Sequence, residues 1–161
     1  MSVPEQRLAA LGLKLPPPVT PAGSYVPFVC TGRLVFIAGQ LCFGADGAVS
    51  PRHIGRLGEE LSADLGKEAA QLSALNVLAQ AKLAAGDLDR IARCVRLAGF
   101  INAAPGYSQL SQIMNAASEL IVDALGERGR HSRTTIGCVV PRNAAIEIEA
   151  VFEIDLASAI T

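Results

Sequence analysis

The most regular pattern in the chain is an alternation of apolar and charged residues between positions 146 and 154. Every second residue is apolar, and the set is Ile146, Ile148, Ala150, Phe152 and Ile154. The residues between them include three glutamates: Glu147, Glu149 and Glu153. Because the side chains of a strand point alternately to its two faces, this pattern predicts a strand with one face in the core and one charged face.

Two longer segments repeat their apolar residues every three or four positions, as an amphipathic helix does. In residues 60–86 the repeat is built from leucine and alanine, and it ends at Gly86. Residues 107–125 carry the same period up to Gly126. The sequence therefore predicts two helices, the first about seven turns long at 3.6 residues per turn.

Shorter apolar runs predict four more strands. Residues 25–30 contain Pro27, which lacks a backbone donor and therefore places this strand at a sheet edge. Residues 33–39 follow after a turn and are apolar at consecutive positions, as in a strand buried on both faces. These two runs form a hairpin, and the other two strands span residues 91–101 and 134–139.

The N-terminal part of the chain has a different composition. Residues 1–14 can form a short helix, and the proline run at 16–18 must stop it. We therefore expect an N-terminal arm over residues 1–23, made of a short helix and a proline-rich linker. An α+β domain over residues 24–156 and a tail over 157–161 complete the predicted organisation.

The predicted order is a hairpin, a helix, a strand, a helix and two strands. Few strands and two long helices indicate a two-layer α+β domain. Right-handed crossovers would place both helices on the same face of the sheet. The other face would have no helix to cover it, so we expect a partner there.

The composition of the chain also indicates that a partner covers part of its surface. Only 18% of the 161 residues are charged and 50% are hydrophobic, whereas a typical domain is about 25% charged. A surface this poor in charge favours a homo-oligomer, although alanine- and glycine-rich monomers share the profile. The length fits one domain, and the apolar content excludes disorder over most of the chain.

Charge and cysteine usage narrow the function classes. A net charge of -1 offers no footprint for a phosphate backbone, and no apolar run approaches the roughly 20 residues of a membrane span. No basic stretch followed by an apolar core marks a secretory signal at the N-terminus. The four cysteines stand singly in or beside apolar runs, without zinc spacing, which predicts buried free thiols in a reducing cytoplasm and no metal site.

The best candidate for chemistry is the basic run 130–133, which opens the strand 134–139. Glu147 and Glu149 lie on the strand that we expect to pair with it. An arginine at this place can hold a carboxylate through two N–H groups, and a glutamate can activate a water. The alternative from the residues alone is a basic loop and a solvated glutamate face joined by weak ion pairs.

Several short segments, taken together and in order, resemble a known family. They are Val35-Phe36-Ile37-Ala38-Gly39-Gln40, Asn115, Arg133, Pro141 and Ile146-Glu147-Ile148-Glu149-Ala150. Their order and spacing resemble the Rid family, the reactive intermediate deaminases, which are also called YjgF-like proteins and formerly L-PSP endoribonucleases. The resemblance covers residues 24–155, and the longer arm resembles a longer branch of that family.

This resemblance implies a chorismate-mutase-like α+β fold with a mixed sheet, and a homotrimer with clefts between adjacent subunits. It also implies the hydrolysis of enamines and imines such as 2-aminoacrylate. Water attacks the imine carbon, ammonia leaves and a 2-oxo acid remains. The reaction needs no metal or organic cofactor.

The resemblance also assigns residue roles. Arg133 would clamp the substrate carboxylate, and Glu147 would orient or deprotonate the attacking water and help to protonate the leaving ammonia. Tyr25 would line the cleft and offer its hydroxyl. Backbone groups around Gly39 and near Thr135 would hold the polar end of the substrate.

Two further positions differ in what they offer. Asn115 stands at the family's helix asparagine and would orient a loop, with helix capping as the structural alternative; for Tyr25 that alternative is packing at an interface. Ala38 stands where the family usually has Ser or Thr, so one hydroxyl contact is missing. The segment from Arg133 to Pro141 is shorter by one residue than in the family's deaminases.

Two other functions remain open. The protein can be a non-catalytic sensor that binds small carboxylates such as 2-oxo acids, since Arg133 and Glu147 suit binding as well as turnover. An endoribonuclease is the third alternative. The net charge of -1 and the aromatic content of 4% speak against it, because RNA sites need basic grooves and stacking rings.

Overall fold

The chain forms one mixed sheet of five strands, and the computed structural model describes residues 1–155. The strands are β1 (Phe28–Thr31), β2 (Leu34–Leu41), β3 (Ile91–Asn102), β4 (Ser132–Cys138) and β5 (Ile146–Ile154), and their order in the sheet is β1-β2-β5-β3-β4. All neighbours are antiparallel except β3 and β4, which are parallel. The expected tail over residues 157–161 lies outside the described residues.

The expected pairing of the strand over 134–139 with the last strand is wrong. β3 lies between β4 and β5 and pairs with both of them. The reason is the crossover: a strand that follows a helix returns parallel to the strand before that helix, so β4 joins β3. β5 then fills the position between β2 and β3.

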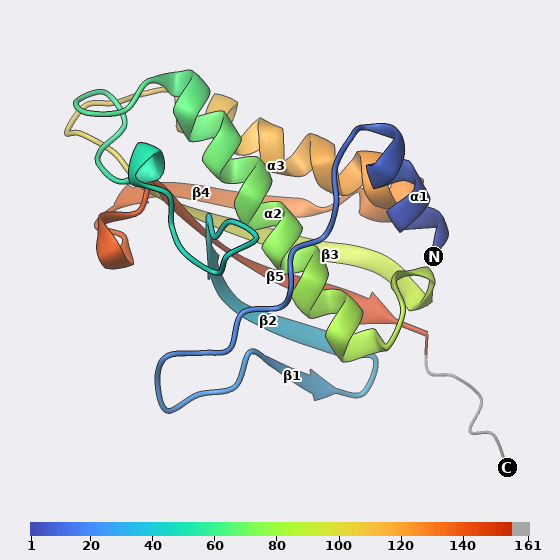
Figure 1. The fold of residues 1–161 in the computed structure, drawn as a ribbon. Coiled ribbons are helices and arrows are strands. Elements are labelled where there is room, and N and C mark those ends of the chain that lie inside the picture. The colour runs from blue at the N-terminus through green and yellow to red at the C-terminus, as the bar shows by residue number, and fades with distance from the viewer. Residues whose placement is uncertain (156–161) are drawn as a thin grey trace, which may run out of the picture.

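Helices cover one face of this sheet, as the two-layer prediction requires (Figure 1). α2 (Ala63–Ala85) begins after Ser62, whose side chain accepts a hydrogen bond from the Leu65 N–H, and ends at Gly86 with φ 82°. α3 (Leu110–Leu125) ends at Gly126. None of the helices in the described part of the chain is long and apolar enough to cross a membrane.

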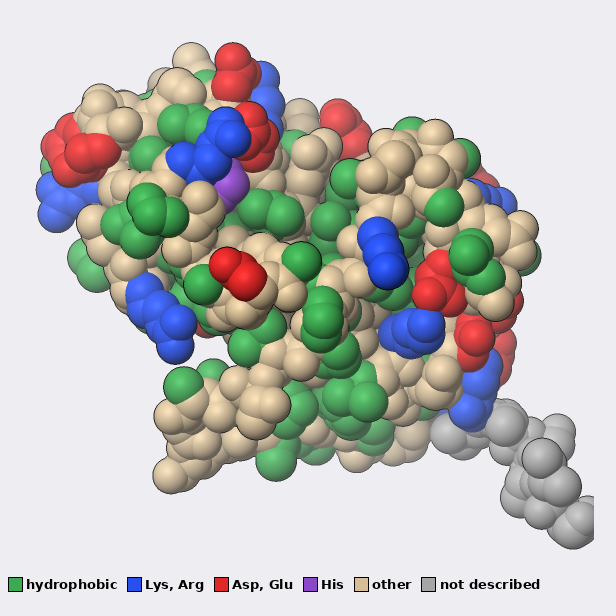
Figure 2. Space-filling model, viewed as in Figure 1, with side chains coloured by type: hydrophobic (Ala, Val, Ile, Leu, Met, Phe, Trp, Pro, Cys, Tyr) green, Lys and Arg blue, Asp and Glu red, His purple; other side chains and the backbone are tan. Residues whose placement is uncertain are grey.

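A third helix, α1 (Val3–Ala10), lies beside α3. It carries a capping box between Ser2 and Glu5, and its Leu8 is fully buried in the core. The segment that follows carries no charged residue between Lys14 and Arg33. Accordingly, the lower edge of the molecule, near β1, shows hydrophobic and uncharged side chains in Figure 2.

The core lies between the sheet and the helices, and β5 shows how the sequence builds it. Its odd and even positions alternate between partly exposed and buried, so the predicted apolar face is confirmed. β2 differs from the prediction. Val35 and Ile37 are buried, but Phe36 between them is 44% exposed, because no helix within residues 1–155 covers the second face of the sheet (Figure 1).

That second face, which we call the open face, carries apolar side chains without a cover. Val29, Phe36 and Val151 lie side by side across β1, β2 and β5. Val29 is 53% exposed and Ile136 on β4 is 46% exposed. Within residues 1–155 nothing packs over this row. The partner that we expect on this face therefore stays a prediction.

The cysteines follow the prediction in part. All four are free thiols. Cys42 and Cys94 are buried, and burial raises the pKa of the Cys94 thiol to about 12, so that it stays protonated. Cys30 is exposed on β1, contrary to the expectation, because it lies on the edge strand.

Candidate functional site

The residues predicted to form the site fall into two groups on opposite faces of the sheet. Arg133 pairs with Leu97 of β3, a fully buried residue under the helices, so its side chain faces the helix layer. Glu147 pairs with Phe100, three residues further along β3, and therefore faces the open side. β3 separates their strands, so the two backbones lie about 10 Å apart at two strand spacings.

The first group is the Arg133 cluster, in which β4 meets α3. The Arg133 Nη1 donates hydrogen bonds to the Asn115 Oδ1 at 2.9 Å and to the Ser118 Oγ at 3.0 Å. Its Nη2 donates to the Ser111 carbonyl at 3.4 Å. These partners are neutral, and no carboxylate among residues 1–155 pairs with the guanidinium, so its charge is oriented but not compensated.

His131 and Ser118 form a second layer of hydrogen bonds in this cluster. The Gly129 carbonyl is 2.6 Å from the His131 Nδ1, which must therefore carry the proton. The His131 Nε2 then accepts a hydrogen bond from the Ser118 hydroxyl, 3.0 Å away. Burial and then the charge of Arg133 lower the pKa of His131, so that the imidazole is neutral at neutral pH.

Sequence reasoning missed Ser111 and Ser118, although a signal was present. With Asn115 they occupy positions i, i+4 and i+7 of α3, so they form a polar stripe on one side of a helix whose other side is apolar. Thr135, two residues after Arg133, faces the same layer. Its hydroxyl oxygen is buried and has no hydrogen-bond partner among the described residues.

The second group is the Glu147 pocket, a cavity of about 200 Å³. Glu147, Gly39 and Tyr25 all line it, and residues 19–22 of the arm form another wall. Burial and then the charge of Glu149 raise the pKa of the Glu147 carboxyl above its ordinary value. A carboxylate with a raised pKa takes up a proton more readily than an exposed one, which suits it to proton transfer.

Gly39 is the residue that allows this arrangement. The ladder between β2 and β5 is irregular between Ile37 and Gln40, so that the strand bulges at Gly39. A Cβ atom at Gly39 would collide with the Glu147 carboxylate. Only glycine therefore lets the carboxylate lie against the backbone of β2.

The other residues near Gly39 hold the bulge. The backbone N–H of Ala38 donates to the Pro27 carbonyl at 2.9 Å, and its carbonyl accepts from the Gln40 side chain at 2.9 Å. Ala38 does not line the pocket. The structure thus places Tyr25, Gly39 and Glu147 together, places Arg133, Asn115 and Thr135 together, and leaves Ala38 in the bulge.

Buried polar residues of α2 fix two walls of the Glu147 pocket, and sequence reasoning missed them. The Gln80 Nε2 donates to the Val19 carbonyl at 2.8 Å, and the Asn76 Nδ2 donates to the Phe43 carbonyl at 2.9 Å. Val19 and Phe43 both line the pocket. The arm is therefore part of the site's construction.

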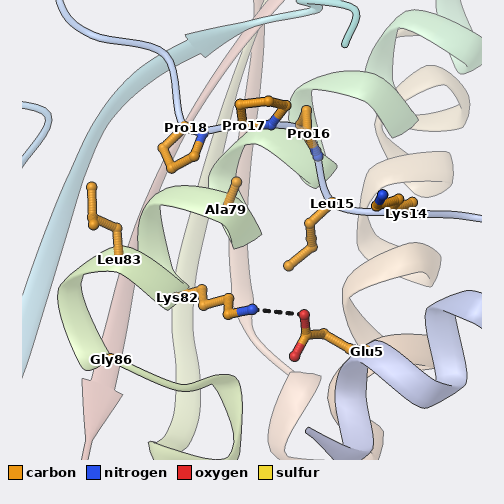
Figure 3. Close-up of a pocket in the computed structure, with 10 residues that line it drawn as sticks. All are labelled: Glu5, Lys14, Leu15, Pro16, Pro17, Pro18, Ala79, Lys82, Leu83 and Gly86. Atoms are coloured by element: carbon orange, nitrogen blue, oxygen red, sulfur yellow. Dashed lines mark hydrogen bonds and ion pairs between the residues drawn. The ribbon is translucent and has the colours of Figure 1, made fainter. Parts of the chain in front are cut away.

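A separate cavity, of about 560 Å³, lies between the arm and α2. Figure 3 shows Lys82 and Glu5 pointing toward each other across it, at 2.7 Å between Nζ and Oε1. This contact, first among the causes, lowers the pKa of Glu5 to about 2. The wall formed by Pro16, Pro17 and Pro18 offers no N–H donors.

Fold and site together define a class: small α+β proteins with a half-covered sheet and a carboxylate pocket between the N-terminal arm, β2 and β5. The family model that matches residues 5–153 is described as "YjgF/chorismate mutase-like, putative endoribonuclease". The chain belongs to this family. The family resemblance and the α+β fold expected from the sequence are thereby confirmed.

Individual relatives agree. Protein TCP17 of Trypanosoma cruzi is 39% identical over 150 residues, which cover 92% of each chain. A protein of unknown function from Agrobacterium tumefaciens has 39% identity and a TM-score of 0.86, with 96% of this chain and 94% of that one covered. A "putative endoribonuclease" from Shewanella oneidensis has 32% identity and a TM-score of 0.90, with 95% and 100% covered.

Proposed function

We propose that the protein hydrolyses imines or enamines of the 2-aminoacrylate type to 2-oxo acids and ammonia. The Glu147 carboxylate takes a proton from a water, and the oxygen of that water adds to the imine carbon. Glu147 passes this proton to the nitrogen, and a second proton then moves through Glu147 from the added hydroxyl to the nitrogen. The C–N bond breaks, ammonia leaves and the hydroxyl oxygen becomes the carbonyl oxygen of the 2-oxo acid. An enamine reacts after a proton has moved from its nitrogen to its β-carbon, which gives the imine. The raised pKa of Glu147 makes this carboxylate a stronger base than an exposed glutamate, as a group that accepts and returns a proton needs.

One observation carries this proposal. The molecule holds both groups that the reaction needs, a half-buried carboxyl and an arginine that is oriented by neutral partners and has no carboxylate partner among the described residues. Such an arginine binds the substrate carboxylate through two parallel N–H groups, which lysine cannot do. The neighbouring Asn115 and Ser118 hold the guanidinium ready for it.

Because the two groups face opposite sides of one sheet, we infer that the site is completed between copies of the chain. The Arg133 cluster of one copy would meet the Glu147 pocket of the next. Such a head-to-tail contact closes into a ring when its rotation allows. The family resemblance suggests a homotrimer, and the uncovered apolar row on the open face is consistent with burial in it.

The test is 2-oxo acid release from imines generated in situ by an amino-acid oxidase or a dehydratase. Arg133→Ala and Glu147→Gln are compared with Arg52→Gln and Glu153→Gln, whose side chains pair with Glu68 and Arg33 at the surface. We expect wild type and both controls to accelerate release, and Glu147→Gln to lose at least about 10²-fold. A wild-type oligomer without acceleration for any precursor would refute the proposal.

The carboxylate sensor is the second candidate, favoured by the same oriented arginine, because binding needs no turnover. In that case Glu147→Gln keeps its affinity for pyruvate and Arg133→Ala loses it. The endoribonuclease activity that names the family is tested in parallel with single-stranded RNA. Degradation that survives Arg133→Ala and Glu147→Gln would place that activity outside the two groups described above.

A further inference from the structure

The connection from β4 to β5 contains two adjacent residues in a conformation that L-residues rarely adopt. Arg142 has φ 58° and Asn143 has φ 53°. Neither is glycine, so the turn stores backbone strain that the surrounding structure must overcome. Strain of this kind concentrates at functional sites. The side chains of this turn are therefore candidates for a functional role.

Buried groups hold the turn in place. The Asn102 Nδ2, in a side chain that is only 2% exposed, donates to the Asn143 Oδ1 at 2.8 Å. The Asn143 carbonyl accepts from the Gly55 N–H at 2.8 Å. A buried amide and a second loop thus fix Asn143, and with it the direction in which Arg142 leaves the backbone.

The side chain that the turn presents lies in the wall of the Glu147 pocket. Arg142 lines that pocket together with Glu147, Tyr25 and Phe43. Its guanidinium carbon lies 5.7 Å from the centre of the Phe43 ring, a cation–π contact. No carboxylate among residues 1–155 pairs with it, and the Asn76 hydrogen bond to the Phe43 carbonyl fixes the loop that carries the ring.

We propose that Arg142 binds a second carboxylate of the substrate, and that the protein acts preferentially on imines of acidic amino acids. This rests on the proposed function, in which Arg133 of a neighbouring copy holds the first carboxylate. The completed site then offers one cation to each carboxylate of a dicarboxylic substrate. Phe43 holds the Arg142 guanidinium on one side of the pocket. The N–H groups at the free edge of the guanidinium then bind the ligand.

The experiment compares Arg142→Gln with Arg52→Gln, which removes the same charge from a surface ion pair. Imines are generated from glutamate or aspartate and, separately, from alanine. We expect Arg142→Gln to lose about 10- to 100-fold in kcat/KM with the acidic imines, the range of a charged hydrogen bond, and less than about threefold with the alanine imine. An equal loss with both, or no loss with either, would overturn the proposal.

Calorimetric binding of 2-oxoglutarate and pyruvate separates this proposal from the proposed function, because it needs no turnover. We expect tighter binding of 2-oxoglutarate, lost in Arg142→Gln and kept in Arg52→Gln. If no imine is hydrolysed but this preference is found, the deaminase fails and the Arg142 site stands. Equal affinity for the two oxo acids in wild type would overturn the site.

Arg142→Gly adds a readout that a purely structural arginine would not give. Glycine adopts a φ near 58° without strain. This variant should therefore unfold at a higher temperature than wild type while it loses the preference for dicarboxylates. A variant that is less stable would show that the Arg142 side chain holds the turn, which contradicts a binding role.

Discussion

The Arg133 cluster and the Glu147 pocket differ in how their polar groups are satisfied. Arg133 is held by three neutral oxygen acceptors, and His131 and Ser118 support it from behind. In the pocket, the Glu147 carboxyl is half-buried with a raised pKa, and the Arg142 guanidinium lies over the Phe43 ring without a carboxylate partner among residues 1–155. The Arg133 cluster holds one charged group in a fixed orientation, whereas the Glu147 pocket holds two ionisable groups that are available to a ligand.

This difference suggests a division of labour. A fixed cation orients a substrate at little entropic cost, whereas a carboxyl that exchanges protons must have a pKa near the working pH. The two faces of a sheet keep these environments apart in one chain.

The largest effect should come from mixing inactive variants. Arg133→Ala and Glu147→Gln each disable one region, so homo-oligomers of either should be nearly inactive. If every site joins regions of two copies, random hybrids restore about a quarter of the sites, since each site then needs one suitable copy on either side. Activity is measured after the two variants are unfolded and refolded together.

The control is a mixture of each variant with wild type, which gives the loss expected from dilution alone. Hybrids that stay as inactive as the separate variants would show that both regions act within a single chain. That outcome would contradict the proposed division of labour between the Arg133 cluster and the Glu147 pocket. The position of the two groups on opposite faces of the sheet would then not explain why they are separate.

A second prediction concerns how the pocket is built. Gly39→Ala places a Cβ atom where the Glu147 carboxylate lies and must displace it. We expect a loss of about 10²-fold in kcat, the effect of a misplacement near 1 Å. Gly137→Ala on β4 is the control, because its Cβ would meet nothing closer than 3.7 Å. Unchanged turnover in Gly39→Ala would show that the position of Glu147 is not critical.

The sequence predicted local features well. The alternation in residues 146–154 defined β5 to the residue, and Gly86 and Gly126 ended the helices where expected. These features depend on neighbours along the chain, so periodicity and turn residues are enough to find them. The residues that carry the family resemblance were also readable without a structure.

Features that depend on residues far apart in the chain could not be predicted from the sequence. Whether Arg133 and Glu147 share a face depends on the order of three strands, and the expected pairing of β4 with β5 was wrong. The turn at Arg142 escaped notice because left-handed residues are usually marked by glycine. Here a buried amide 41 positions away, Asn102, supports the turn instead.

A third prediction separates the two faces of the sheet. Phe36→Asp adds a charge to the open face, where it should leave the fold intact but shift the oligomer toward monomers and lower activity. Leu97→Ala on the helix face should instead cost about 2–5 kcal/mol in the free energy of unfolding. Sedimentation and denaturant unfolding distinguish the two results. A Phe36→Asp protein with wild-type assembly would show that the open face is not an interface.

The smallest effect concerns His131, which supports the Arg133 cluster. Its pKa is lowered in the folded chain, so the unfolded chain takes up a proton first as the pH falls. The stabilisation from neutral His131 is therefore complete above the unfolded value of about 6.5 and is lost as the pH falls through the folded value. His131→Gln, which cannot titrate, should therefore flatten this part of the stability curve between pH 7 and 5. Denaturant unfolding at both pH values measures it, and an equally steep fall in the variant would mean that other groups set the pH dependence.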